Sequence, residues 1–252
     1  MKVTKYKVNT FIALWRTTKL FIHFSYGAIK VFLFVKHYDD AKKAIILQDW
    51  SKKLLNMLDI GLIIKGQMPA KLDNTLIVSN HISWLDILII FTVIRPKFVA
   101  KKEIAEWFII GQLTKAGDTI FIDRNNKKDI MQVNRQLSSE LSSGNCIAVF
   151  PEGTTSKGES LLPFKASLFE PIYQSKGKIL PITIQYKDCD GKITSRPSFA
   201  GEVSLLTSIW RVLSCYQLTV TITFHELLMS RHYPNRNALA LAAQEVIRSD
   251  WD

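Results

Sequence analysis

Cysteine is scarce in this sequence, and the three cysteines that occur do not form a metal-binding pattern. Cys146, Cys189 and Cys215 lie far apart, without the close spacing that holds a metal ion. Their odd number also leaves at least one of them without a partner for a disulfide. We therefore expect free thiols, a reducing compartment and no metal site.

Long apolar runs are absent from the N-terminal region. The longest uncharged run there, Leu20 to Ile29, is far shorter than the ~20 residues that span a bilayer. It lacks a small-residue cleavage site, so we do not expect a signal peptide. Hydrophobic residues nevertheless make up 47% of the 252 positions, which excludes a disordered chain and allows a sizeable core.

Acidic residues are few in the first 70 positions, which hold four Asp and Glu against twelve Lys and Arg. This region therefore carries +8 of the formal net charge of +11. From Phe11 to Val35 the basic residues alternate with aromatic and aliphatic ones, which suits a helix that lies at a lipid interface. A second helix is expected from Ala41 to Leu58. We expect residues 1–59 to be membrane-associated helices at the cytoplasmic face of a membrane, with core-packing helices as the alternative.

A basic surface also suits nucleic acid, which is the other acidic partner to consider. The sequence has no helix-turn-helix, zinc-finger or RNP signature. Its N-terminal aromatic residues lie among long aliphatic ones, as in a surface that enters lipid. We therefore expect membrane lipids as partners and no nucleic acid.

Short apolar runs alternate with helical patterns over residues 60–252, which we expect to form one domain. This alternation is typical of an α/β fold with a mostly parallel sheet flanked by helices. The expected strands are Leu62–Lys65, Leu76–Ser79, Phe98–Ala100, Thr119–Ile122, Cys146–Phe150, Ile179–Ile184, short stretches at Val203 and Leu205, and Leu218–Phe224. The expected helices are Leu85–Val93, Lys101–Leu113, Lys128–Ser142 and Ala238–Ile247.

One polar turn joins the strand that ends at Ser79 to the following helix, for which Ser83 is the expected N-cap. His81 and Asp86, five residues apart, would lie about 140° apart on a continuous helix. Across a strand-to-helix bend they can meet, and the carboxylate can then hold one imidazole nitrogen while the other acts as a base. Taken alone, the pair is better explained by a turn histidine and a first-turn acid beside the helix dipole.

Two further strand ends carry polar residues. Arg124 follows the strand at Thr119–Ile122 and can offer a planar fork to a phosphate or carboxylate, or pair with Asp123. The strand at Cys146–Phe150 runs into a Pro-Glu-Gly turn, in which Gly153 permits close approach to the backbone. Because open α/β sheets bind ligands at the carboxyl ends of their strands, we expect these loops to line one site.

Four elements of the sequence together resemble the motifs of the glycerolipid acyltransferase family, especially its lysophosphatidic acid acyltransferase branch. They are Asn80-His81-x4-Asp86, Phe121-Ile122-Asp123-Arg124, Phe150-Pro151-Glu152-Gly153-Thr154 and Leu180-Pro181-Ile182. The resemblance extends over about residues 60–225, and its first and third motifs are the specific ones.

This resemblance implies transfer of an acyl chain from acyl-CoA or acyl carrier protein to a lysophospholipid hydroxyl. The default acceptor is 1-acylglycerol-3-phosphate, with phosphatidic acid as product. The resemblance assigns His81 as the base and Asp86 as its orienting group. It places the acceptor on Arg124, Glu152, Gly153, Thr154 and Pro181, and it requires no metal and no cofactor beyond the acyl donor.

The chemistry of these residue types fits that reaction. An alcohol needs a base to become a nucleophile, whereas a departing thiolate, from a thiol of pKa about 8.5, needs little help. No Gly-x-Ser-x-Gly elbow occurs, so we expect no covalent intermediate and guess that backbone amides hold the oxyanion. Three alternatives remain open: another lysolipid acceptor such as lyso-ornithine lipid, a thioesterase, and a non-catalytic membrane-binding protein.

Overall fold

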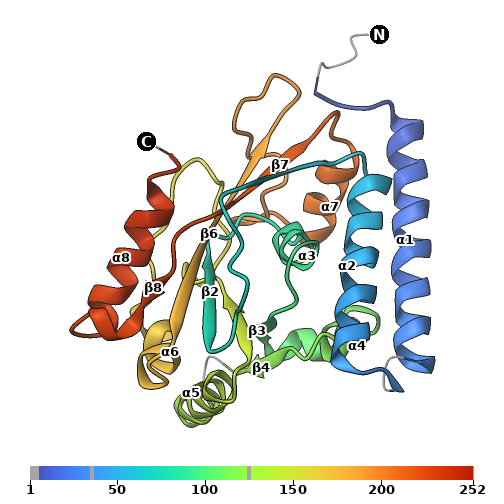
Figure 1. The fold of residues 1–252 in the computed structure, drawn as a ribbon. Helices are drawn as coiled ribbons and strands as arrows, with labels where there is room; N and C mark the ends of the chain where they lie inside the picture. The colour runs from blue at the N-terminus through green and yellow to red at the C-terminus, as the bar shows by residue number, and fades with distance from the viewer. Residues whose placement is uncertain (1–5, 35–36, 124–125, 252) are drawn as a thin grey trace.

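The computed structural model describes residues 6–34, 37–123 and 126–251. Helices cover both faces of a single eight-stranded sheet in this part of the chain (Figure 1). The strands are β1 (Gly61–Lys65), β2 (Thr75–Ser79), β3 (Lys97–Lys101), β4 (Ile120–Ile122), β5 (Cys146–Val149), β6 (Lys178–Lys187), β7 (Thr219–Phe224) and β8 (Leu228–Met229). The α-helices are α1 (Thr10–Leu33), α2 (Asp40–Met57), α3 (Leu85–Phe91), α4 (Ile110–Ala116), α5 (Lys127–Ser142), α6 (Glu170–Gln174), α7 (Leu205–Leu213) and α8 (Arg236–Arg248). Short 3₁₀ helices include η2 (Lys102–Glu106), η3 (Ala166–Phe169) and η4 (Ser230–His232).

The sheet is mostly parallel, as the sequence predicts. Its order is β1-β7-β6-β2-β5-β3-β4, with β8 beside β6. Only β7 and β8 run antiparallel to their neighbour β6. β2 lies between β6 and β5 and pairs with both in parallel, so the chain leaves β2 at the middle of one sheet edge. The turn after β2 therefore lies at the carboxyl ends of parallel strands, where α/β sheets commonly bind ligands.

Two hydrophobic clusters, one on each face of the sheet, hold the layers together. Because side chains alternate along a strand, β2 sends Ile77 into one cluster and Leu76 and Val78 into the other. The first cluster also contains residues of α2, α3 and α7, and the second contains residues of α5, α6 and α8. Buried on both faces, β2 is uniformly apolar from Leu76 to Val78, as is typical of a central parallel strand.

Two predicted elements differ in the structure. The single helix expected over Lys101–Leu113 is instead η2 followed by α4, with Trp107 extended between them. The backbone of Gly111 lies against the carbonyl of Ala105, where a Cβ would come within 2.4 Å, so the chain folds back on itself there. The strand expected at Val203 and Leu205 is wrong, because Val203 lies outside any strand and Leu205 begins α7. Ser204 caps that helix by accepting from the amide of Thr207, and the helical period then buries Val212 and Leu213 together.

The N-terminal helices pack against the α/β layers, although the predicted division at residues 59 and 60 stays a prediction. α2 contributes Leu54, Leu55 and Leu58 to the core. α1 is anchored by Arg16, which is 6% exposed and donates from Nη1 to the carbonyls of Leu213 and Cys215. The outer face of α1 is apolar and exposed, as shown by Phe11, Trp15, Phe21, Ile22, Ile29 and Phe32. In the part of the chain that the structure describes, no helix combines the length and apolarity required to traverse a bilayer.

Candidate active site

His81 and Asp86 meet across the bend between β2 and α3, as the sequence predicts. Nδ1 of His81 lies 2.8 Å from Oδ2 of Asp86. The chain leaves β2 after Ser79, turns through residues 80–84 and enters α3 at Leu85, so Asp86 lies in the first helical turn and points back toward His81. Because an ionised carboxylate only accepts hydrogen bonds, this contact places the imidazole proton on Nδ1 and leaves Nε2 as an acceptor.

Asp86 is fully buried, and its carboxylate is surrounded by hydrogen-bond donors. Oδ2 accepts from the backbone amides of Ile82 and Ser83 at 2.7 and 2.9 Å, in addition to His81. Oδ1 accepts from the phenol of Tyr186 at 2.6 Å. The amides of Ile82 and Ser83 ahead of α3 thus bond to Asp86. The helix begins at Leu85 with Trp84 as its N-cap and without a cap bond from that side chain. The hydroxyl of Ser83, the predicted cap, accepts from the amide of Leu85 at 3.4 Å. A buried charge requires such compensation, and here four donors supply it.

The imidazole of His81 is held in one plane by stacking. The ring of Phe150 lies 4.0 Å from it, centroid to centroid, at an angle of 12°. The side chain of His81 is 20% exposed, so it reaches solvent at the edge of the sheet. Within the described residues, Nε2 has no hydrogen-bond partner. The structure therefore presents an oriented, accessible nitrogen acceptor.

Glu152 ties the loop after β5 to the turn that carries His81. Its Oε1 accepts from the amide of His81 at 2.6 Å, and its Oε2 accepts from the amide of Leu162 at 3.1 Å. Burial, assisted by the charge of Asp86, raises the pKa of Glu152 to about 7, against the two amide bonds that act to lower it. With 3% of its surface exposed, Glu152 contacts backbone here, and its predicted role at the acceptor stays a prediction.

The other predicted site residues lie in different surroundings. Gly153 follows Glu152 with a φ of +72°, and a Cβ there would come within 2.5 Å of Nζ of Lys165. Thr154 is exposed on the same loop, whereas Pro181 is buried in β6 opposite Val78. Arg124 lies outside the described residues. The structure thus brings His81, Asp86, Glu152 and the loop of Gly153 together, while it buries Pro181 inside the sheet.

Two aromatic residues of the site were missed by sequence reasoning. Phe150 was assigned to a buried strand and to the start of the third motif, without a role in the site, and Tyr186 lies beyond the predicted end of its strand at Ile184. Phe150 directly precedes the Pro-Glu-Gly turn, which is a signal for a position beside the site. Tyr186 has no comparable signal, because its contact with Asp86 joins residues 100 positions apart.

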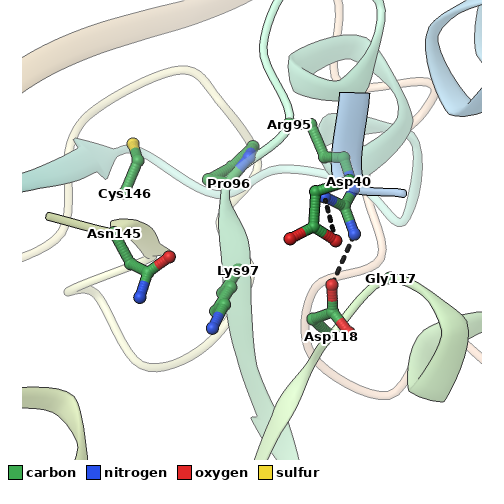
Figure 2. A pocket seen from close by; sticks show the side chains of 8 residues that line it. All are labelled: Asp40, Arg95, Pro96, Lys97, Gly117, Asp118, Asn145 and Cys146. Atoms are coloured by element: carbon green, nitrogen blue, oxygen red, sulfur yellow. Dashed lines mark hydrogen bonds and ion pairs between the residues drawn. The ribbon is translucent and has the colours of Figure 1, made fainter. Parts of the chain in front are cut away.

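A cavity of about 270 Å³ lies at the opposite edge of the sheet, where β3 and β5 begin (Figure 2). Its charged residues largely pair with one another, as Figure 2 shows for Arg95 between Asp118 and Asp40. None of the residues that line it belongs to the predicted site. Across residues 6–34, 37–123 and 126–251, no group of three His, Cys, Asp or Glu side chains is arranged to hold a metal ion.

Comparison with known proteins agrees with this geometry. A family model described as Acyltransferase matches residues 62–185, which extend from β1 into β6 and include the His81 turn. The chain is 38% identical to a 1-acyl-sn-glycerol-3-phosphate acyltransferase of Neisseria gonorrhoeae, over 79% of this chain and 77% of the relative. The enzyme of the same description from Neisseria meningitidis is 36% identical, over 84% and 82% of the two chains.

Two further similarities bear on substrate and fold. A lyso-ornithine lipid O-acyltransferase of Pseudomonas aeruginosa is 31% identical, over 79% of this chain and 75% of the relative. The crystal structure of the 1-acyl-sn-glycerophosphate acyltransferase PlsC from Thermotoga maritima superimposes with a TM-score of 0.75. That structure is 19% identical and covers 96% of this chain and 94% of its own, so it supports the fold including the N-terminal helices.

Proposed function

Because this chain belongs to the acyltransferase family of the 1-acyl-sn-glycerol-3-phosphate acyltransferases, we propose that it acylates the free hydroxyl of 1-acylglycerol-3-phosphate to give phosphatidic acid. The coarser assignment, an acyltransferase of the lysophospholipid type, follows from the similarity to its relatives. The observation that carries the proposed chemistry is the His81–Asp86 contact at the carboxyl ends of the parallel strands.

His81 is the proposed general base. Its Nε2 takes the proton of the acceptor hydroxyl while Nδ1–H donates to Asp86, and the hydroxyl oxygen attacks the thioester carbonyl carbon. The resulting tetrahedral intermediate collapses, the carbon–sulfur bond breaks, and the thiolate recovers the proton from His81. Asp86 orients the ring and stabilises the imidazolium that forms between the two steps. Backbone amides are the proposed oxyanion donors.

The acceptor head group is proposed to bind at the loops after β4 and β5. Arg124 would hold the phosphate through its planar guanidinium, and Gly153 and Thr154 would line the same pocket. Glu152 would serve acceptor binding by holding that loop against the amide of His81. Pro181 would shape the strand beneath the pocket, because it pairs with Val78 two residues before the turn.

A thioester donor, acyl-CoA or acyl carrier protein, is the proposed co-substrate, and no further cofactor is needed for the steps above. The enzyme is proposed to act at the cytoplasmic face of a membrane. Support for membrane association comes from α1, in which exposed aromatic residues such as Trp15 and Tyr26 lie beside Lys19 and Lys30 in cation–π contacts. Such a surface suits the lipid interface, where the acceptor resides.

One experiment tests the assignment and its alternatives together. Purified protein is incubated with labelled acyl-CoA and a membrane lipid extract, and the labelled product is identified by mass. Labelled phosphatidic acid is expected. A labelled ornithine lipid would support the second acceptor, which the Pseudomonas aeruginosa relative favours. Acceptor-independent release of labelled fatty acid would indicate a thioesterase, and liposome binding without any labelled product would indicate a non-catalytic protein.

A further inference from the structure

Tyr186 donates the fourth hydrogen bond to Asp86, from the opposite side of the carboxylate to His81. Its hydroxyl lies 2.6 Å from Oδ1, while His81 and two backbone amides bond to Oδ2. Tyr186 and Asp86 are 1% and 0% exposed, so water does not replace this donor in the folded protein. Among the described residues, the phenol is thus the side-chain donor that bonds to Oδ1 of Asp86.

The fold positions Tyr186 by extending β6 beyond its neighbour β2. β2 ends at Ser79, which pairs with Ile182, whereas β6 continues to Lys187. The side chain of Asn80 replaces the missing strand: its Oδ1 accepts from the amide of Ile184 at 2.8 Å, and its Nδ2 donates to the carbonyl of Ile184 at 2.9 Å. Because side chains alternate, Tyr186 then lies on the same face of β6 as Ile184, toward α3 and Asp86.

The phenol of Tyr186 remains a donor throughout the working pH range. Complete burial, followed by the charge of Asp86, raises the pKa of Tyr186 well above its usual range. The hydrogen bond from the phenol stabilises the negative charge of Asp86. Asp86 therefore holds the proton on His81 less tightly than it would without this donor. Fixing Oδ1 also prevents the carboxylate from rotating away from His81.

We infer that Tyr186 is a positioning residue of the reaction, which acts through Asp86 to set the orientation and basicity of His81. The inference rests on the proposed function, because it assigns His81 as the base. It predicts an effect on turnover and on the pH profile, with little effect on substrate affinity, since Tyr186 is buried behind Asp86 and does not reach the exposed side of His81.

The test compares Tyr186→Phe with wild type and with a matched control, Tyr173→Phe. The control removes the hydroxyl of Tyr173 on α6, which donates to the carbonyl of Pro234 ahead of α8 and has no bond to Asp86. We expect Tyr186→Phe to lower kcat about 10- to 100-fold, the loss given by one hydrogen bond to a charged group, with both KM values within about twofold. The acid limb of kcat/KM should move to higher pH, because Asp86 then holds the proton on His81 more tightly. Glu152, bonded to the amide of His81, and Lys165, beside Gly153, are further ionisable groups of the site and are unchanged in this variant.

Two measurements keep the inference falsifiable if Tyr186→Phe folds poorly. Placing 3-fluorotyrosine at position 186 preserves the side chain but makes the phenol a stronger donor, so the acid limb should move to lower pH. The low-field proton resonance of His81 Nδ1–H, which needs no turnover, should shift in both variants and stay unchanged in Tyr173→Phe. Unaltered kcat, pH profile and resonance would overturn the role of Tyr186 even in an active acyltransferase. If the resonance shifts in the two Tyr186 variants but the wild-type protein catalyses no acyl transfer, the proposed function alone would be overturned.

Discussion

Replacing Glu152 by Gln is predicted to remove a specific pH dependence of folding stability. Glu152 is buried, and its pKa is raised from about 4.5 to about 7 because burial outweighs the two amide bonds that it accepts. Between these pH values the folded protein binds a proton at Glu152 that the unfolded chain has already released. The contribution of Glu152 to the free energy of unfolding is therefore highest at acid pH and falls as the pH rises through this window.

The magnitude follows from the size of the pKa shift. A difference of about 2.5 pKa units corresponds to about 3 kcal/mol, at about 1.4 kcal/mol per unit. Roughly 2 kcal/mol of this change falls between pH 5.5 and 8, where the unfolded chain is already ionised and the folded protein loses its proton. Because other groups also titrate there, the prediction concerns the difference between wild type and Glu152→Gln.

Urea unfolding at pH 5.5 and pH 8 measures this difference. The free energy of unfolding of wild type, relative to Glu152→Gln, should fall by about 2 kcal/mol between the two pH values. Glu245→Gln, which alters an exposed ion pair with Arg248 on α8, serves as the matched control. A relative stability that rises with pH would refute the reasoning, because it would mean that the amides of His81 and Leu162 stabilise the anion by more than burial costs.

Two further predictions concern substrate and membrane. Arg124→Lys should raise the apparent KM for a phosphate-bearing acceptor and spare that of the donor, because an ammonium does not reproduce a bidentate guanidinium contact; equal effects on both KM values in steady-state kinetics would point to a structural role. Binding to anionic liposomes, measured by sedimentation, should weaken but persist at high salt, because the apolar face of α1 is insensitive to screening. Lys19→Glu with Lys30→Glu should weaken binding further at low salt, by about 1 kcal/mol for each lysine removed. The same charge change at Lys176 and Arg231, which closely follow α6 and β8 in the chain, should have a smaller effect. α6 and β8 lie on the other side of the molecule from α1 (Figure 1).

The strands and the main turn could be predicted from the sequence because their signals are local. The apolar run at Leu76–Val78 identifies a strand buried on both faces, and the following polar turn identifies the bend that brings His81 and Asp86 together. The closing helix, predicted at Ala238–Ile247, extends over Arg236–Arg248. In each case the sequence pattern and the element that it predicts lie in the same short segment of the chain.

The elements that were not predicted depend on contacts between distant parts of the chain. Ser204 caps α7 locally, but the helix at Leu205 also depends on the packing of Val212 and Leu213 against the core. The donors around Asp86 come from the turn at residues 81–83 and from Tyr186. Only the register between β2 and β6 makes the contact with Tyr186 possible. Glu152 was assigned to the acceptor because the family resemblance implies that role, whereas its two bonds to the amides of His81 and Leu162 emerge only in the fold.

The most direct test of the account is the acyl transfer activity of His81→Ala. Labelled acyl-CoA and 1-acylglycerol-3-phosphate are supplied to wild type, to His81→Ala and to a control, His232→Ala, which alters an exposed histidine in η4. Turnover of His81→Ala should fall by about 10²–10⁴, the usual contribution of a general base, while the acceptor KM changes little and the control matches wild type. Near-normal turnover in a folded His81→Ala protein would contradict the assignment of His81 as the base.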